Sequence, residues 1–337
     1  MSSTPIILGI ESSCDETAAA VLVNGVVRSN VIAGQDVHRL WGGVVPELAS
    51  RAHQENIVPV VAEALKNAGM TKEELHGIAV TNGPGLMGAL LVGTCFARSM
   101  AQALNLPLLA VNHMQAHVLA HFIQDGTDRI PPVFPFLNLT VSGGHTLIVL
   151  VRSPLDMEVL GTTVDDAAGE AFDKGAKVLG LPYPGGPLID HHARDGDPKK
   201  FKLPNPQIPG LDMSFSGVKT AFHGLVRMGT IKNPDFVNRE RANLCASLQQ
   251  CIVDILLQKL SKAGHSHKIP RIAISGGVSA NSALREQVKK LADREGWTVH
   301  IPPLSYCTDN GAMIAMAGHF LFHAGQFAKL DVVPYAR

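Results

Sequence analysis

The sequence predicts an α/β protein with largely buried sheets, and two observations lead to that class. Short apolar runs that suit buried strands alternate with longer segments of helical spacing. Hydrophobic residues make up 46% of the 337 residues and charged residues 17%, which is ordinary for an α/β enzyme and too apolar for a disordered chain. This length is enough for two lobes with a large core.

The first lobe is expected to cover residues 1–125. Asn24-Gly25 is a strong hairpin signal between two apolar runs. Pro59 is expected to kink or split a long helix, because proline has no amide hydrogen to donate. Strands are predicted at residues 6–10, 18–23, 26–33, 78–81 and 108–111, and helices at 45–68 and 86–104.

The second lobe is expected to cover residues 126–310, after a tract rich in proline and glycine at 124–135. It repeats the opening of the first lobe, with a strand, a turn of small residues and a second strand, which favours a duplication. A C-terminal helix over 311–337 is expected to join the first lobe. Strands are predicted at 136–141, 146–151 and 271–275, an irregular tract at 182–209, and helices at 237–263 and from Ser279.

The charges and cysteines narrow the class of protein. Lys plus Arg and Asp plus Glu both number 29, so a nucleic-acid partner would have to meet a local basic patch or be held by other subunits. Five cysteines without a C-x-x-C pair favour a reducing cytoplasm. Residues 1–5 do not resemble a signal peptide, and the apolar segment 86–104 is expected to be too short and too interrupted to span a bilayer. We therefore expect a cytoplasmic protein with no membrane partner.

Two histidines one helical turn apart, His113 and His117, are candidate metal ligands. Side chains at i and i+4 project from one face of a helix, so both imidazoles can bind one ion. Asp309, from a distant loop, would complete three protein ligands and leave a coordination position open, as in catalytic sites. A structural role for the two histidines stays open as the alternative.

Paired histidines also suggest a metalloprotease. The zincin pattern needs a glutamate directly after the first histidine as general base. Here that position is Met114, followed by Gln115, and no acid lies between the two imidazoles. The sequence therefore argues against a protease.

Four glycine-rich turns are candidate anion sites, because a backbone without Cβ atoms lets its amides approach a phosphate. Two have the form Ser-Gly-Gly directly after a buried strand, which favours phosphate or nucleotide contact. The P-loop lysine and the Rossmann glycine spacing are absent, which argues against those two nucleotide folds. The turns are Gly83 to Gly85, Ser142 to His145, Gly185 to Pro187 and Ser275 to Gly277.

Acidic residues stand in two further segments. Asp15 and Glu16, in the turn between the first two strands, are either candidate general bases or solvated carboxylates. Cys14 beside them is predicted to be a buried small residue, since no histidine partner for a nucleophile is evident. Residues 165–174 carry acids at helical spacing, which suit either ribose hydroxyls or a capped helix start.

Together these motifs resemble those of the bacterial TsaD family, relatives of the archaeal and eukaryotic Kae-type proteins. The match runs essentially from end to end of the chain. The matching segments are residues 9–17, 42–51, 83–85, 113–117, 141–146, 165–174, 183–187, 214–217, 276–281 and 307–310.

The resemblance implies an actin/Hsp70/sugar-kinase-like fold, with two ribonuclease-H-like lobes and a nucleotide cleft between them. It implies transfer of the threonylcarbamoyl group from threonylcarbamoyl-AMP to the N6 amine of the adenosine 3′ of the anticodon, in tRNAs reading ANN codons. The product is t6A. A kinase or ATPase of the same fold is the alternative, and a non-enzymatic scaffold is a third possibility.

The resemblance also implies the site residues. His113, His117 and Asp309 would bind one divalent metal ion, Fe2+ or Zn2+. Asp15 or Glu16 is a candidate for the base that takes the amine proton. The nucleotide would be threonylcarbamoyl-AMP, with ATP or ADP as further ligands. The substrate-binding residues would be Thr140, Val141, Ser142, Gly143, Gly144, Asp173, Gly186, Asp190 and Asn281.

Members of the family act with other proteins, so the resemblance implies partners as well. The substrate is tRNA, and the other partners are a TsaB-type paralogue in a heterodimer and a TsaE-type ATPase. A threonylcarbamoyl-AMP synthase would supply the intermediate.

Overall fold

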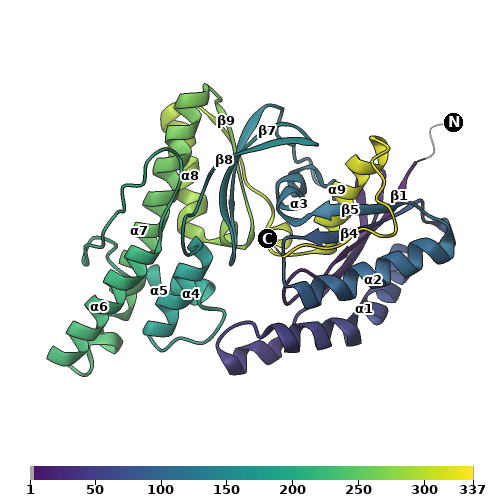
Figure 1. The fold of residues 1–337 in the computed structure, drawn as a ribbon. Helices are drawn as coiled ribbons and strands as arrows, with labels where there is room; N and C mark the ends of the chain where they lie inside the picture. Colours follow the sequence, from purple (N-terminus) through teal and green to yellow (C-terminus); the bar gives the residue numbers. More distant parts are fainter. Residues whose placement is uncertain (1–3, 337) are drawn as a thin grey trace. The chain divides into compact units, whose positions relative to one another are not determined.

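The computed structural model describes residues 4–336 and divides the chain into two compact units (Figure 1). Unit 1 comprises Met1–Pro131 with Thr308–Arg337, and unit 2 comprises Pro132–Cys307. The boundary falls within the tract at 124–135. Residues 1–3 and 337 lie outside the described residues. The expectations for the N-terminus and for the end of the last helix rest partly on these residues.

Unit 1 is built on a five-stranded mixed sheet in the order β3-β2-β1-β4-β5. Strand β1 runs antiparallel to β2 and parallel to β4. The strands are β1 (Ile6–Glu11), β2 (Thr17–Val23), β3 (Val26–Ala33), β4 (Gly77–Gly83) and β5 (Leu108–Asn112). The helices are η1 (Asp36–Trp41), α1 (Pro46–Ala68), η2 (Lys72–Glu74), α2 (Met87–Leu104), α3 (His113–Leu119), η3 (Ala120–Phe122) and α9 (Gly311–His323).

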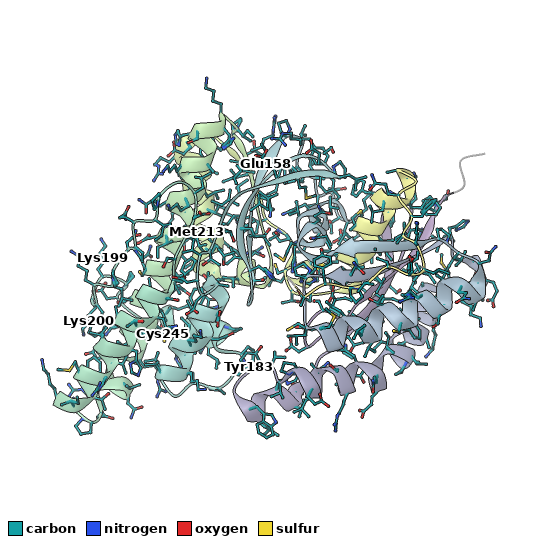
Figure 2. All side chains as sticks on the ribbon, viewed as in Figure 1. Glu158, Tyr183, Lys199, Lys200, Met213 and Cys245 are labelled. Carbon is teal, nitrogen blue, oxygen red and sulfur yellow. The ribbon has the colours of Figure 1, made fainter. Side chains whose placement is uncertain are left out.

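Unit 2 is built on a second five-stranded sheet, in the order β10-β9-β6-β7-β8. Met213 and Cys245, labelled in Figure 2, belong to its apolar core. The strands are β6 (Phe136–Val141), β7 (Thr146–Ser153), β8 (Asp156–Thr162), β9 (Arg271–Ser275) and β10 (Thr298–His300). The helices are α4 (Ala168–Val178), α5 (Gly185–Ala193), α6 (Ser216–Lys232), α7 (Phe236–His267), η4 (Gly277–Ala280), α8 (Ser282–Glu295) and η5 (Leu304–Tyr306).

The two sheets have one topology. In each, the first strand pairs with the second in an antiparallel hairpin, the third extends that side, and the fourth and fifth add in parallel on the other side. The strand-turn-strand echo in the sequence is therefore the start of a repeated structural unit. Two of its strands, β8 and β10, were not predicted, because β8 is a largely exposed edge strand and β10 has three residues.

Strand β1 lies at the centre of the sheet in unit 1 and is covered on both faces. Leu8 and Ile10 join the core cluster that also contains residues of α1 and α2. Gly9 points to the other face, because alternate residues of a strand face opposite sides. A Cβ on Gly9 would lie 2.4 Å from the Ala315 amide nitrogen and the Gly311 carbonyl oxygen, so α9 packs directly on this strand.

Two local expectations were wrong, and so was one part of a third. Helix α1 is not split at Pro59 but continues through it, because Ile57 and Val60 are buried on either side of it and tertiary packing outweighs the lost hydrogen bond. The last helix ends at His323 rather than at 337, and Gly325 follows with a positive φ. The tract 182–209 is only partly irregular, since it contains α5.

Helix α2 also differs from expectation in one respect. It is long and apolar enough to cross a membrane by length and composition alone, because 18 residues reach about 27 Å. Core helices of other proteins pass the same test. In this structure, the buried face of α2 packs against β4 and α1 of unit 1.

The contact between β1 and α9 gives a testable prediction. We expect Gly9→Ala to lower the free energy of unfolding by about 3 kcal/mol, because the new methyl group would clash with backbone atoms of α9, which cannot relieve the clash by changing a rotamer. Gly34→Ala is the control, since a Cβ there has no atom within 4 Å, and its effect should stay below about 1 kcal/mol. Urea unfolding followed by circular dichroism measures both, and equal midpoints for the two variants would contradict the packing argument.

Candidate functional site

The two candidate histidines stand at the start of α3, directly after the buried strand β5. The Asn112 side chain accepts a hydrogen bond from the Gln115 amide at 3.0 Å and caps this helix. His113 and His117 are both buried, one turn apart on the same face. Asp309 precedes α9, where Asn310 caps that helix through the Met313 amide at 2.9 Å. Two helix caps therefore fix the three candidate ligands.

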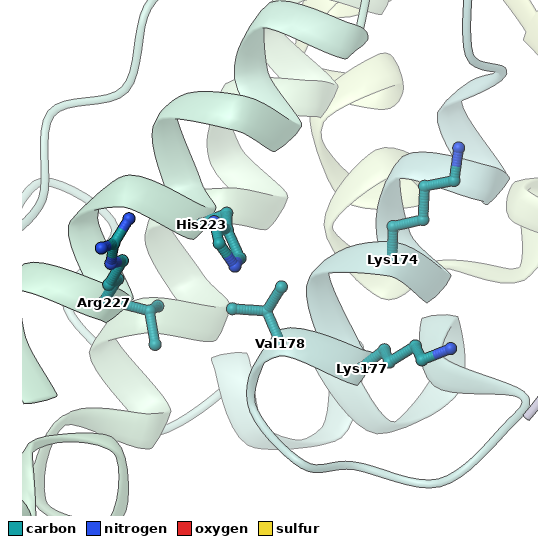
Figure 3. A pocket seen from close by; sticks show the side chains of 6 residues that line it. Lys174, Lys177, Val178, His223 and Arg227 are labelled. Carbon is teal, nitrogen blue, oxygen red and sulfur yellow. The ribbon is translucent and has the colours of Figure 1, made fainter.

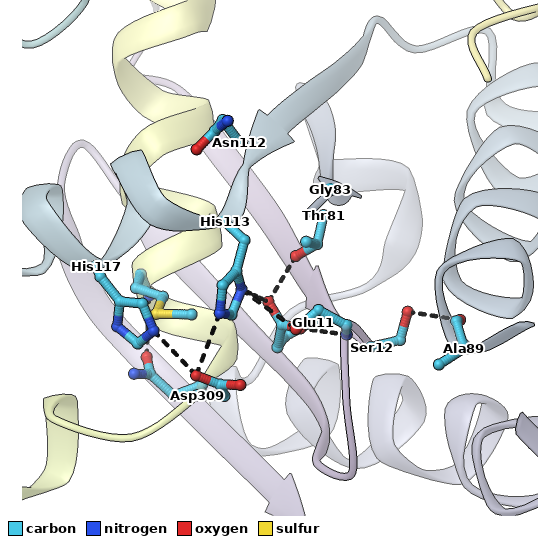
Figure 4. Close-up of polar contacts among 12 residues, drawn as sticks. Glu11, Ser12, Thr81, Gly83, Ala89, Asn112, His113, His117 and Asp309 are labelled. Carbon is cyan, nitrogen blue, oxygen red and sulfur yellow. Dashed lines mark hydrogen bonds and ion pairs between the residues drawn. The ribbon is translucent and has the colours of Figure 1, made fainter. Parts of the chain in front are cut away.

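The three side chains converge (Figure 4). The Asp309 Oδ1 atom lies 3.0 Å from His117 Nε2 and 3.4 Å from His113 Nε2. One ligand atom of each residue lies within 4.8 Å of the other two, and this is the one such group of three among the described residues. Neither ring nitrogen of His117 forms a hydrogen bond of acceptable geometry with the described residues. Because buried polar atoms are rarely left unsatisfied, this donor set fits a single bound metal ion.

Glu11, at the end of β1, is a residue of this site that the sequence analysis did not single out. Its Oε2 accepts hydrogen bonds from His113 Nδ1 at 3.1 Å and from the Thr81 hydroxyl at 2.6 Å, and its Oε1 accepts from the Ser13 amide. A carboxylate on the second nitrogen of a metal-binding histidine fixes its tautomer and orientation. The signal in the sequence was a glutamate that ends an otherwise apolar buried strand.

The charges of this cluster depend on one another. Burial alone would lower the pKa of His113, but the Asp309 and Glu11 carboxylates raise it well above its usual value. Burial alone would raise the pKa values of Asp309 and Glu11, but the imidazole of His113 holds both below their usual range. The site therefore holds a positive charge between the buried carboxylate of Glu11 and the half-buried carboxylate of Asp309.

Asp15 and Glu16 lie in the short turn between β1 and β2. Burial, with the charges of Asp309 and Asp15, raises the pKa of Glu16 to about 10. Without a cation nearby, Glu16 is therefore protonated at neutral pH, and a cation bound beside Asp309 would favour its charged form. Burial and the neighbouring acids also raise the pKa of the Cys14 thiol, so this residue is not a ready nucleophile.

His53, on α1, holds both ends of this turn. Burial lowers the pKa of His53, so its imidazole is neutral. Its Nε2–H donates to the Cys14 carbonyl at 3.0 Å, and its Nδ1 accepts from the Thr17 hydroxyl at 2.7 Å. The sequence offered no partner for His53, because the two bonds join residues more than thirty positions apart.

In unit 2, two glycine turns lie side by side. Strands β6 and β9 are parallel neighbours with Thr140 opposite Ser275, so their carboxyl ends meet at one edge of the sheet. Gly276 has a φ of 84°, and a Cβ there would lie 2.4 Å from the Val141 carbonyl oxygen. Ligands in α/β folds bind at such carboxyl ends. The two Ser-Gly-Gly motifs of the sequence thus belong to one place in the fold.

The segment from Thr140 to Gly144 presents its backbone more than its side chains. The Thr140 hydroxyl is buried and accepts hydrogen bonds from Asn138 at 2.8 Å and Ser275 at 3.2 Å. Val141 is fully buried. Ser142 closes the turn through its amide to the His145 carbonyl at 2.8 Å, while a Cβ on Gly143 or Gly144 would meet nothing within 4 Å. Open glycine backbone of this kind can approach a phosphate.

The other candidate substrate residues fix the ends of helices in unit 2. Asp173 Oδ1 accepts from the amides of Gly185 at 2.8 Å and Gly186 at 3.1 Å. Asp190 Oδ1 accepts from the Ser282 hydroxyl at 2.6 Å. Asn281 donates to Gln249 at 2.6 Å and caps α8 through the Leu284 amide at 3.0 Å. Asp173 therefore adjoins Gly186, and Asp190 adjoins the residue after Asn281.

The repeated five-stranded sheets place the chain in the class of actin/Hsp70-like proteins with ribonuclease-H-like units. Full-length HypF in a phosphate- and nucleotide-bound form shares this fold, with a TM-score of 0.62 and 11% identity over 97% of this chain and 48% of that one. The activator of 2-hydroxyisocaproyl-CoA dehydratase from Clostridium difficile with bound ADPNP has a TM-score of 0.53 and 12% identity over 95% and 97%. This chain spans about half the length of HypF. The predicted fold class is confirmed.

Within this class, the chain belongs to the TsaD family, tRNA N6-adenosine threonylcarbamoyltransferase, whose family model matches residues 26–316. A tRNA N6-adenosine threonylcarbamoyltransferase of Porphyromonas gingivalis is 56% identical over 333 residues, which cover 98% of each chain. The protein of the same name from Phocaeicola vulgatus is also 56% identical with the same coverage. The family resemblance seen in the sequence is confirmed, and the metalloprotease alternative has no support.

The hydrogen bonds of His53 give the second prediction. We expect His53→Leu to lower the free energy of unfolding by about 2–4 kcal/mol, because the Cys14 carbonyl and Thr17 hydroxyl lose a buried partner. His76→Leu is the control: it loses one longer bond from the Ile6 amide, at 3.3 Å, and should cost less than about 1 kcal/mol. Urea denaturation would speak against this role if His53→Leu were no more harmful than His76→Leu.

Proposed function

We propose that this protein transfers the threonylcarbamoyl group from threonylcarbamoyl-AMP to the N6 amine of the adenosine 3′ of the anticodon, in tRNAs reading ANN codons. The product is t6A. The observation that carries the proposal is the convergence of Asp309 on the buried His113 and His117, in a chain whose relatives are named for this reaction over nearly their whole length.

The metal proposed here is Fe2+ or Zn2+, held by His113, His117 and Asp309. Two imidazoles and one carboxylate form a donor set that suits either ion and leaves coordination positions for a substrate. Bound there, the ion would act as a Lewis acid toward a carbonyl oxygen. Glu11 would keep His113 oriented through the bond at 3.1 Å.

Unit 2 would hold the nucleotide end of the donor. The amides between Thr140 and Gly144 would donate to the phosphate, which becomes the leaving group when AMP departs. The ribose and adenine would contact Asp173, Gly186, Asp190 and Asn281, whose backbones are fixed by the helix caps described above. ATP or ADP would compete for the same residues.

The reaction needs a base, and we assign that role to Asp15 or Glu16. The adenosine amine attacks the carbamoyl carbon, the bond from that carbon to the phosphate oxygen breaks, and AMP leaves. The amine nitrogen then loses one proton, which the carboxylate would accept; for Glu16 this requires that a bound cation first displaces the proton it carries. Both residues lie in the turn that His53 anchors, next to the candidate metal site.

We propose a cytoplasmic protein that works with several partners. The tRNA is the acceptor substrate, and a threonylcarbamoyl-AMP synthase would supply the donor. A TsaB-type paralogue, in a heterodimer, and a TsaE-type ATPase complete the set. The family name supports tRNA as the acceptor.

The function is tested in cells depleted of this protein. We expect nucleoside mass spectrometry of total tRNA to show loss of t6A, restored by the wild-type gene and not by His113→Ala/His117→Ala. Unchanged t6A in fully depleted cells would refute the proposed function and favour the kinase alternative or the scaffold.

The same variants test the metal independently of activity. His319 and His323 have the same spacing on α9, with ring centroids 4.5 Å apart, and no carboxylate completes a group of three with them among the described residues. Elemental analysis of purified protein should find about one metal ion per chain in the wild type and in His319→Ala/His323→Ala. Retention of the metal by His113→Ala/His117→Ala would contradict the assigned ligands.

The base has its own test. We expect Asp15→Asn or Glu16→Gln to slow single-turnover transfer at least about 100-fold, the usual range for a lost general base. Single-turnover rates with preformed threonylcarbamoyl-AMP separate this step from supply of the donor. If neither substitution slows transfer, the base is not in this turn.

A further inference from the structure

We propose that a basic groove between α4 and α6 of unit 2 binds the phosphate backbone of the tRNA substrate. This inference rests on the proposed function and extends it by naming the surface that the acceptor contacts. The groove has a volume of about 390 Å³ (Figure 3). It is lined by Lys174, Lys177, Val178, His223, Val226 and Arg227.

The positive charge of this groove contrasts with the neutral chain. Lys plus Arg and Asp plus Glu are equal in number, at 29 each. Helix α6, residues 216–232, nevertheless carries Lys219, His223, Arg227 and Lys232 and contains no Asp or Glu. Lys219, His223 and Arg227 follow one another at intervals of four, so they share one side of the helix. This is the local patch that a nucleic-acid partner of a neutral chain requires.

The ion pairs of unit 2 show which of these positive side chains are free to contact an external anion. Lys174 lies 3.0 Å from Asp166 and 2.7 Å from Glu170, and Lys219 lies 2.7 Å from Asp166, so acids neutralise these two lysines. Lys177 and Arg227 form no ion pair with any side chain that the structure describes, and both are exposed. Two uncompensated cations therefore remain, one on each helix.

The arrangement suits an extended polyanion better than a single phosphate. Figure 3 shows that Lys174 and Lys177 extend away from the groove on the α4 side, while Arg227 extends on the α6 side. The cations thus do not converge on one point, as binding of a small anion would require. A backbone that carries a charge on every nucleotide can contact both sides in turn, above a floor of Val178 and Val226.

Helix α4 connects this groove to the proposed donor site. A Cβ on Gly169, in its first turn, would lie 2.4 Å from the Ser142 carbonyl oxygen, so α4 begins against the glycine turn. Lys177 lies eight residues further along, which is roughly 12 Å along a helix axis. That separation corresponds to a few nucleotides of RNA. A tRNA whose target adenosine reaches the glycine turn after β6 can therefore place neighbouring phosphates at the groove.

The test compares Lys177→Ala/Arg227→Ala with Lys199→Ala/Lys289→Ala in the full-length protein. The control pair removes the same charge from exposed lysines of unit 2 that form no ion pair with the described side chains, and Lys199 is labelled in Figure 2. Filter binding of unmodified tRNA is measured between about 50 and about 200 mM salt. We expect the groove variant to bind on the order of tenfold more weakly, with the slope of log affinity against log salt reduced by about 2.

Single-turnover transfer at increasing tRNA concentration gives a second readout. The groove variant should need about tenfold more tRNA for half-maximal rate at an unchanged maximal rate, while the control matches the wild type. If the groove variant matches the wild type in both assays, or loses no more than the control, the proposed surface is wrong, and an acidic protein becomes the partner to test. Failure of the wild type, assayed together with the proposed partner proteins, to modify any tRNA would instead refute the proposed function, and filter binding would still decide whether the groove binds RNA.

Discussion

The close contact between β1 and α9 is the constraint on which the candidate metal site depends. Gly9 has no Cβ, so Gly311 and Ala315 of α9 can approach the backbone of β1 closely, and the missing Cβ of Gly311 lets the same helix approach Ala19 and Ala20 of the neighbouring strand β2. Glu11 lies two residues after Gly9, and Asp309 lies two residues before Gly311. The same contact therefore sets the separation of the two carboxylates that flank His113, although they are almost three hundred residues apart in the chain.

Electrostatics explain why this arrangement favours a cation. Glu11 and Asp309 flank the buried imidazole of His113, and each carboxylate would be costly to bury without positive charge nearby. In the protein alone, a proton on His113 supplies that charge. A divalent ion would supply more of it and would release the proton, so metal binding and proton release are linked at this site. The turn that carries Asp15 and Glu16 is held against the site by His53.

The sequence predicted those parts of the fold that depend on local pattern. Buried strands such as β1, β4 and β6 are rich in apolar residues, and the spacing of His113 and His117 follows from helical periodicity. Strand β8 was missed because its exposed edge residues lack that pattern, and the expected split of α1 at Pro59 was wrong because burial on both sides cannot be seen locally. Glu11 and His53 acquire their roles through contacts with residues distant in the chain, which no short motif records.

The repeated topology explains how the same arrangement of strands can suit a cation in unit 1 and an anion in unit 2. In unit 1 the turn after β1 lies against the end of β4, where a Cβ on Gly85 would be 2.6 Å from the Ser13 carbonyl oxygen. In unit 2 the turn after β6 lies against the end of β9, where Gly276 meets Val141 in the same way. The first turn carries Asp15 and Glu16 and adjoins the candidate metal site. The second carries serine, two glycines and a histidine, with no acid, and presents open backbone amides. The same strand-turn-strand unit thus suits a metal in one copy and a phosphate in the other, and only the side chains of the two turns differ in kind.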